Sequence, residues 1–135
     1  MSLIKTVNFT CLGDERGSLV ALESNKDVPF DIKRVYYIFG TKEGVSRGFH
    51  AHRNLKQVAV CVAGSCQFVL DNGDLKESIV LNNPLNGILI DGLMWREIHD
   101  ITPDCVLMVL ASEYYSEEDY IRNYNDFKKE TLLDA

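Results

Sequence analysis

The sequence predicts an all-β protein that ends in a single α-helix. Most of the chain consists of short runs rich in alternating or β-branched residues, each bounded by Gly, Pro, Asn, Asp or Ser. Asn72-Gly73 lies between two such runs and is a strong signal for a β-hairpin. Only after Ser116 does the spacing of apolar residues change from the period of a strand to that of a helix.

The expected strands cover most of the chain, and no repeat, linker or low-complexity segment divides it. We therefore expect a single domain over residues 1–135. Pro84 and Pro103 fall between runs, as expected for residues that cannot donate to a β-ladder. The predicted strands are Val7–Leu12, Ser18–Glu23, Arg34–Phe39, Gly48–His52, Gln57–Val62, Ser65–Asp71, Leu75–Leu81, Gly87–Ile90, Trp95–Asp100 and Cys105–Ser112.

The predicted helix runs from about Glu117 to Leu132. Ser116 is its expected N-cap, and the acidic residues that follow are favourable in a first helical turn. Tyr120, Tyr124 and Phe127 recur at helical spacing and form an apolar and aromatic stripe. We expect this stripe to pack against the outside of the sheets, and a role for the tyrosines in ligand binding is the alternative.

Composition indicates an ordinary globular protein. A chain of 135 residues with 46% hydrophobic and 25% charged residues can bury a core of usual size. Its net charge of −6 provides no basic field for the phosphates of a nucleic acid, so we expect no nucleic-acid partner. No stretch is apolar and long enough for a membrane span or a signal peptide. These features predict a cytoplasmic protein.

The cysteines also fit a reducing compartment. Cys11, Cys61, Cys66 and Cys105 show no Cys-x-x-Cys spacing, which disfavours a zinc ribbon or a redox motif. A two-residue turn at Ala63-Gly64 would place Cys61 and Cys66 opposite each other on adjacent strands. A disulfide between them is one possibility, and buried free thiols are the one that we favour.

Two of the three histidines lie in the segment Arg47-Gly48-Phe49-His50-Ala51-His52. In an extended strand successive side chains point to opposite faces, so His50 and His52 should share one face. Histidine titrates near neutral pH, which suits it to proton transfer or to metal binding. The segment therefore predicts either a metal site or an acid–base site.

The spacing of Gly44, His50, His52, Gln57 and Gly64 resembles the first motif of the cupin superfamily. This resemblance implies a jelly-roll β-barrel of the cupin, RmlC-like kind, with the short C-terminal α-helix added. In metal-binding cupins a glutamate stands at the position of Gln57. A neutral amide is a poor ligand for a divalent ion.

The second cupin motif, expected at Gly92–His99, places Arg96 near the position of the remaining histidine ligand. A guanidinium does not lose its proton and cannot bind a metal. A shifted register could bring His99 to that position, but we interpret His99 as a loop anchor. We therefore expect a site without a metal.

Several segments together resemble one family, the cupin-type sugar-nucleotide 3,4-ketoisomerases, which act on dTDP-4-keto-6-deoxyglucose. The resemblance extends over nearly the whole chain. More distantly, the Arg-Gly-x-His pattern is similar to that of the 3,5-epimerases of the rhamnose pathway. The segments that carry the family resemblance are Arg16–Ala21, Lys33–Phe39, Arg47–His52, Val109–Ser112, Tyr114-Tyr115 and Asp119–Arg122.

The resemblance implies an isomerase, an intramolecular oxidoreductase that needs neither metal nor other cofactor. The ketone at C4 of such a sugar acidifies the proton on C3, and its removal gives an enediolate that accepts a proton at C4. This reaction needs a base with a suitable pKa and donors near the developing oxyanion. By resemblance, His50 is the base, His52 moves protons or orients the sugar, and the hydroxyl of Tyr36 binds its reacting part.

The same resemblance implies a binding site for the nucleotide sugar. The planar guanidinium of arginine suits diphosphate oxygens, and Arg34 and Arg47 are the main candidates. Arg16 and Gly17 are also expected to bind substrate, and Arg16 could reach the sugar and influence the configuration at C4. The family further implies a homodimer.

Two other functions stay open at this point. One is a 3,5-epimerase acting on the same class of sugar nucleotide, and the other is a cupin that binds a sugar nucleotide without catalysis. The ketoisomerase is the prediction that we follow, with a 3-amino-3,6-dideoxy sugar of a surface polysaccharide as the end product. The sequence leaves a fucose-type or quinovose-type product open, with Arg16-Gly17 favouring the former.

Overall fold

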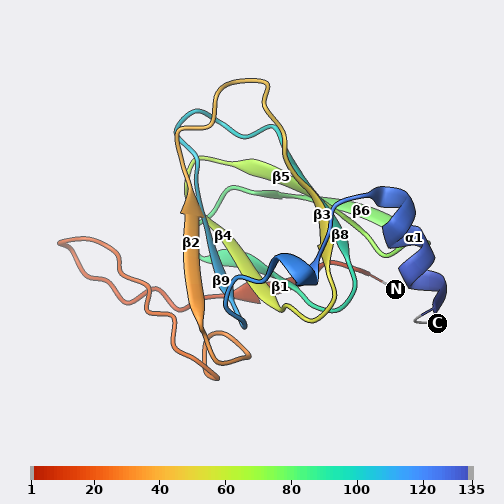
Figure 1. The fold of residues 1–135 in the computed structure, drawn as a ribbon. Coiled ribbons are helices and arrows are strands. Elements are labelled where there is room, and N and C mark those ends of the chain that lie inside the picture. The colour runs from red at the N-terminus through yellow and green to blue at the C-terminus, as the bar shows by residue number, and fades with distance from the viewer. Residues whose placement is uncertain (1, 134–135) are drawn as a thin grey trace.

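The computed structural model describes residues 2–133 as two five-stranded antiparallel sheets that enclose a core, with one helix at their side (Figure 1). The first sheet has the order β1 (Lys5–Asn8), β7 (Asn86–Ile90), β4 (Gln57–Ala63), β9 (Val106–Ala111) and β2 (Arg34–Ile38). The second has the order β10 (Tyr120–Ile121), β3 (Arg47–His52), β8 (Trp95–His99), β5 (Cys66–Asp71) and β6 (Lys76–Leu81). The predicted all-β architecture is therefore confirmed.

The main core lies between the two sheets and consists of apolar side chains from both. A second cluster lies on the outer face of the first sheet, where Val58 and Val60 pack against Phe9, Val28 and Phe30. β4 is consequently buried on both faces, which explains its continuous apolar sequence. The main core includes Phe68, Leu70, Ile88, Ile90, Ile98 and Leu107.

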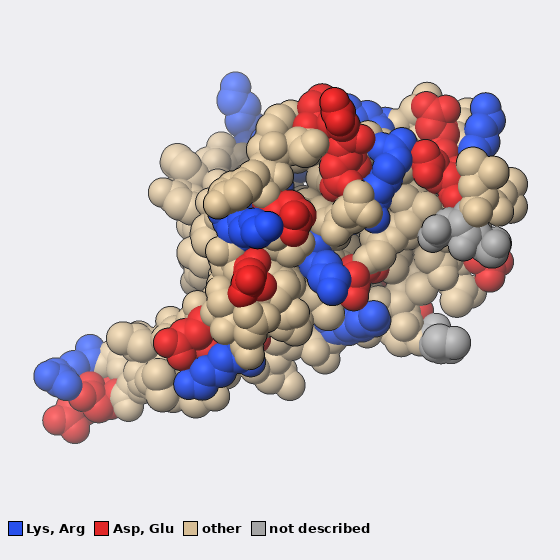
Figure 2. All heavy atoms as spheres, turned by 60° about the horizontal axis from the view of Figure 1, so that its bottom comes forward, with Lys and Arg blue, Asp and Glu red and all other residues tan. Residues whose placement is uncertain are grey.

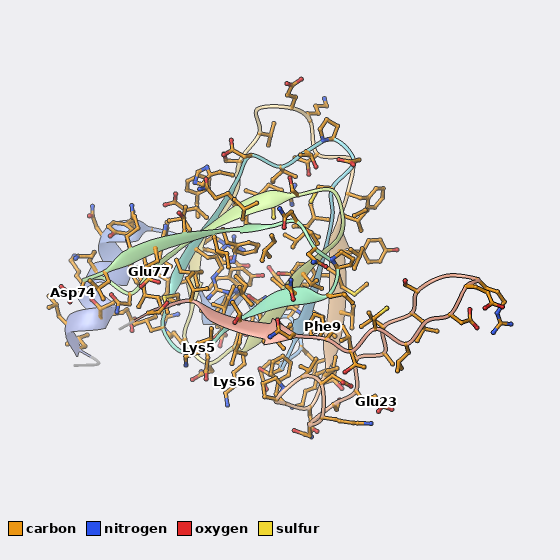
Figure 3. All side chains as sticks on the ribbon, turned by 180° about the vertical axis from the view of Figure 1, so that it is seen from behind. Lys5, Phe9, Glu23, Lys56, Asp74 and Glu77 are labelled. Carbon is orange, nitrogen blue, oxygen red and sulfur yellow. The ribbon has the colours of Figure 1, made fainter. Side chains whose placement is uncertain are left out.

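Residues 10–31 connect β1 to β2 as a long arm, of which the first part projects from the barrel and the returning part packs Val28 and Phe30 on the first sheet (Figure 1, red to orange). Figure 3 shows the arm extending beyond the labelled Phe9 and returning past Glu23. The prediction of a strand at Ser18–Glu23 is wrong, because within residues 2–133 the arm joins neither sheet and makes only isolated bridges, Asp14 to Gly17 and Ser24 to Val28.

The C-terminal helix is shorter than predicted. Glu117–Asp119 form a single 3₁₀ turn, in which Ser116 makes no side-chain cap, and α1 spans only Tyr124–Leu133. Between them, Tyr120 pairs with β3 in β10. Pairing with the edge of β3 has replaced the helical hydrogen bonds of this segment.

The aromatic stripe is divided by this change. Tyr124 and Phe127 pack on Trp95, with ring centroids 5.2 and 5.8 Å from the indole, so their predicted docking on the barrel is confirmed. Tyr120 belongs to β10, which pairs with β3 as its neighbouring strand. Within residues 2–133, no helix is long and apolar enough to cross a membrane.

The β4–β5 connection also differs from the prediction. β4 and β5 belong to different sheets, so Cys61 and Cys66 do not face each other across a ladder. Both thiols are buried and free, as favoured from the sequence. The Asn72-Gly73 signal does mark a hairpin, in which β5 pairs with β6 and the amide of Asn72 donates to the carbonyl of Leu75 at 3.1 Å.

Candidate active site

β3 holds the two histidines side by side. Gly48 and Phe49 have positive φ angles of 88° and 60°, and the register with β8 shifts between Gly48 and His50. This irregularity turns Phe49 outward, whereas the imidazoles of His50 and His52 lie together with ring centroids 4.9 Å apart. The prediction that both histidines share one face is confirmed.

Tyr120 joins the histidines from β10. Its ring centroid lies 5.1 Å from that of His50 and 4.2 Å from that of His52. The guanidinium of Arg122 covers the same ring at 4.2 Å and is itself held by Glu117 at 2.8 Å. A phenol from the C-terminal segment is therefore part of the histidine site.

His52 is oriented by a carboxylate. Its Nδ1 lies 3.1 Å from Oδ2 of Asp119, and Oδ1 of Asp119 accepts the backbone amides of Arg53 and Asn54. With Nδ1–H donating to Asp119, a neutral His52 presents an unprotonated Nε2. This atom is buried and makes no hydrogen bond within the described residues 2–133. It is consequently an acceptor whose hydrogen-bonding capacity is unused, next to the ring of Tyr120.

Arg96 and Gln57 hydrogen bond to each other next to the histidine pair. Arg96 is 2% exposed and pairs with His50 in the β3–β8 register. Its guanidinium donates to Oε1 of Gln57 and, at 2.9 Å, to the carbonyl of Met94. The amide of Gln57 in turn donates to the hydroxyl of Tyr36 at 3.1 Å. The two side chains that replace the expected cupin ligands thus form one polar network with Tyr36.

Burial and the Arg96 charge keep the histidines neutral. Burial, with Arg96 as the second cause, lowers the pKa of His50 to about 4, and the same two causes lower the pKa of His52. Burial raises the pKa of Tyr36 and lowers that of Arg96 to about 10. Near neutral pH, His50 and His52 are therefore proton acceptors. The phenol of Tyr36 is neutral, and Arg96 carries a positive charge.

The comparisons with known proteins identify the family. The FdtA family model, described as "WxcM-like, C-terminal", matches residues 2–132. The chain belongs to the FdtA family. A relative from Aneurinibacillus thermoaerophilus, named TDP-4-oxo-6-deoxy-α-D-glucose-3,4-oxoisomerase, is 55% identical over 125 residues, which are 93% of this chain and 90% of the relative. The predicted family resemblance is confirmed.

Solved structures agree with this assignment to the FdtA family. A 3,4-ketoisomerase from Helicobacter canadensis has a TM-score of 0.93 and 46% identity, covering 96% of this chain and 97% of its own. A mutant 3,4-ketoisomerase from Thermoanaerobacterium thermosaccharolyticum, solved with TDP-4-keto-6-deoxyglucose, has a TM-score of 0.94 and 43% identity, covering 98% and 96%. A dTDP-4-dehydrorhamnose 3,5-epimerase from Bacillus anthracis, at 16% identity and a TM-score of 0.74, shows the shared cupin fold alone.

In this FdtA-family chain the predicted binding residues do not all meet. Arg34 lies 5.4 Å from the ring of Tyr36 and 5.7 Å from that of Tyr115, near the histidine site, while Arg47 is exposed at the start of β3. Arg16 and Gly17 lie in the turn of the arm, where Arg16 pairs with Asp14 and its side chain is 86% exposed. Within one chain, Arg16 and Gly17 therefore lie in the exposed turn of the arm and not beside the histidines.

Four members of the site are not identified as catalytic or binding residues from the sequence: Gln57 and Arg96, which are considered only as replacements for metal ligands, and Asp119 and Tyr120. The sequence places Asp119 in the first turn of the predicted helix and Tyr120 in the apolar stripe on the surface of that helix. The signal that could have found them was the family-like segment Asp119–Arg122, which contains both. His99 hydrogen bonds to Ser46 at 2.8 Å and to Glu97 at 2.9 Å, as expected of a structural anchor.

Proposed function

We propose that this protein is a TDP-sugar 3,4-ketoisomerase that moves the keto group of dTDP-4-keto-6-deoxyglucose from C4 to C3. The observation that carries the proposal is the pair of neutral histidines next to the buried guanidinium of Arg96. A base next to a fixed positive charge is the arrangement that an enediolate intermediate requires. The relative that is 55% identical carries the same activity in its name.

In the proposed mechanism His50 takes the proton from C3. The electrons of the C3–H bond form the C3–C4 double bond, and the carbonyl oxygen on C4 becomes the oxyanion. His52 moves the hydroxyl proton from the oxygen on C3 to that on C4, using the Nε2 that Asp119 leaves unprotonated. Protonated His50 then gives a proton to C4, which leaves the ketone at C3 and restores the neutral base, so C3 is oxidised and C4 reduced without an external oxidant.

The surrounding groups stabilise the intermediate. Arg96 provides positive charge in a buried site, where a charge acts more strongly than in water. Tyr36 has a neutral hydroxyl held by Gln57, and it is proposed to hydrogen bond to the reacting part of the sugar. All of these roles are performed by side chains of the chain itself.

Proton exchange tests this function directly. The protein is incubated in D₂O with the thymidine-linked 4-keto sugar, and exchange is followed by NMR. Exchange at C3 and C4 together with a 3-keto product is expected for the isomerase. Exchange at C3 and C5 would indicate an epimerase, and no exchange would indicate a binding protein; either result would overturn the proposal.

We also propose a biosynthetic role for the reaction. A 3-keto sugar is chemically suited to an aminotransferase, so we propose that the product leads to a 3-amino-3,6-dideoxy sugar of a surface polysaccharide, made in the cytoplasm. The fucose-type configuration at C4 stays a prediction that rests on Arg16-Gly17. The coupling between the C4 and C5 protons of the product distinguishes it from the quinovose type.

We expect activity to be indifferent to metal. Gln57 and Arg96 stand at ligand-like positions of the cupin motifs and are already bonded to each other. Dialysis against EDTA should therefore leave turnover unchanged, as measured by formation of the 3-keto product. Loss of turnover that is restored by zinc, manganese or iron would contradict this expectation.

Diphosphate binding should depend on the shape of arginine as well as on its charge. Replacing Arg47 or Arg34 with lysine keeps the charge but removes the bidentate guanidinium. We expect Arg47→Lys to weaken TDP binding by about 1–3 kcal/mol, the value of a charge-assisted hydrogen bond. Calorimetric titration measures the affinity, and thermal melting checks the fold. Unchanged affinity in both variants would place the diphosphate elsewhere.

We also propose a homodimer. β2 is the last strand of its sheet, and it exposes Tyr37 by 60% and the adjacent Phe39 by 67%. The arm exposes Leu12 and Leu19 by more than half and projects away from the barrel with charged residues at its end (Figure 2). An unpaired edge with apolar side chains is typical of an interface. In such a dimer, Arg16 and Gly17 of one protomer could approach the sugar site of its partner.

Complementation tests this arrangement. His50→Asn and Arg16→Ala are each expected to impair turnover as homodimers. If Arg16 acts on the partner's site, a mixed dimer contains one site with both changes and one with neither, so unfolding and refolding the two variants together should restore activity. No restoration, with mixed dimers shown by native mass spectrometry, would mean that Arg16 acts within its own chain or not at all.

A further inference from the structure

Three buried cysteines meet at one point of the core. Cys61 lies on β4, Cys66 begins β5 and Cys105 directly precedes β9. Their exposed fractions are 0%, 1% and 1%. The sulfur of Cys61 lies 3.4 Å from that of Cys66 and 3.6 Å from that of Cys105, and all three sulfurs lie within 4.8 Å of one another. The proposed isomerase mechanism uses none of these thiols.

Two sides of the triangle of sulfurs have nearly the length found in a thiolate site, and the third, between Cys66 and Cys105, is within 4.8 Å. An ion that binds sulfur at about 2.3 Å, as zinc does, keeps its sulfur ligands roughly 3.8 Å apart. The separations of 3.4 and 3.6 Å are only a few tenths of an ångström shorter. Because β4 and β5 lie in different sheets, one ion bound here would join both sheets and the turn before β9.

Charge decides which ion fits. The three thiols belong to the main apolar core, together with Phe68, Leu107 and other large apolar residues. Burial raises the pKa of Cys105 to about 12, and the hydrogen bond with Cys66, followed by burial, raises the pKa of Cys61. A monovalent or divalent cation on three thiolates would leave net negative charge in this core, which is costly.

We propose that Cys61, Cys66 and Cys105 form a binding site for trivalent arsenic, supplied as arsenite. Arsenous acid has three hydroxyl groups, and each is replaced by one cysteine sulfur. Three As–O bonds break and three As–S bonds form, while the thiol protons leave with the hydroxyl groups as three water molecules. Arsenic stays trivalent, no oxidant is needed, and the product is uncharged. The site therefore takes up its ligand without placing a charge in the core.

Native mass spectrometry of the reduced protein tests the site. The phosphine TCEP is used as reductant, because dithiols compete for arsenite. We expect a mass increase of one arsenic atom less three hydrogen atoms, and a higher melting temperature, since a ligand that binds only the folded state stabilises it. Cys66→Ala keeps the position apolar and should abolish this adduct. Cys11→Ser is the matched control, because Cys11 is exposed and outside the cluster, and it should bind arsenite like the wild type.

A second preparation serves as a control for slow access of arsenite to the buried thiols. The protein is also refolded from urea in the presence of arsenite, so that slow opening of the core cannot hide binding. Circular dichroism of Cys66→Ala and of Cys105→Ala checks that the variants fold. Absence of the three-sulfur adduct after both preparations would overturn the proposal. Tighter binding of cadmium or zinc than of arsenite would overturn the charge argument, and a disulfide between Cys61 and Cys66 in the reduced protein would overturn the site.

Discussion

His50→Asn is expected to lower turnover by about 10²-fold or more, the usual contribution of a positioned proton-transfer group. Asparagine keeps much of the shape and polarity of histidine but cannot take up the C3 proton. The substitution leaves the arginines in place, so affinity for TDP should hardly change. Rates are measured from formation of the 3-keto product, and affinity by calorimetry.

His99→Asn is the matched control for this experiment. His99 is the remaining histidine of the chain and is bonded to Ser46 and Glu97, so its loss should leave turnover near the wild-type value. His52→Asn completes the series. Near-normal turnover in His50→Asn with a large loss in His52→Asn would mean that the two histidines have the opposite roles, with the Nε2 of His52 as the base.

Arg96→Met should produce the second large effect. A methionine fills the buried space but removes the positive charge next to the enediolate, and loss of one such stabilising group typically costs about 10²–10³-fold in kcat. Arg96→Lys keeps a charge and should lose less. KM should change less than kcat in both variants, because the intermediate carries the charge that Arg96 faces.

The pH profile separates this role from a merely structural one. His50 has to be neutral to act, and its pKa is about 4, so wild-type turnover should be flat from pH 7 to about pH 5 and fall below that. Burial is the first cause of this low pKa and Arg96 the second. Removing Arg96 should therefore move the acid limb to higher pH, part of the way toward about 6.5. An unchanged acid limb in Arg96→Met would contradict the assignment.

The same low pKa predicts how the free energy of unfolding depends on pH. In the unfolded chain His50 binds a proton below about pH 6.5, whereas in the folded chain it does so only near pH 4. Between these values the unfolded state holds more protons, so stability falls as the pH decreases. In His50→Asn this part of the slope should be absent.

The parts of the site that the sequence predicts are those that local periodicity determines. His50 and His52 share a face because they are two residues apart on a strand, and the positions of Gln57 and Arg96 follow from motif spacing. That Arg96 donates to Gln57 could not be read from spacing, since it depends on how two strands from different sheets approach each other.

The errors arise where tertiary contacts override local patterns. Tyr120 has helical spacing to Tyr124, yet it pairs with His52, which is far away in the sequence. Asp119 is hydrogen bonded to His52 and to two backbone amides of the segment after β3. These contacts hold the segment from Glu117 to Ile121 against β3, so it does not continue as an α-helix. Ser18–Glu23 has the alternation of a strand but no neighbouring strand with which to pair. Local preference is a weak guide at such positions.

The left-handed turn within β3 bears on how this site can vary among related sequences. A Cβ atom on Gly48 would lie 3.0 Å from the carbonyl oxygen of Arg96 and 3.3 Å from the Cα of Glu97, in a backbone conformation that already disfavours other residues. Any larger residue would push β3 away from β8 and separate His50 from Arg96, even though both side chains were kept. The glycine therefore restricts which sequences can form this site, although its own atoms take no part in the chemistry.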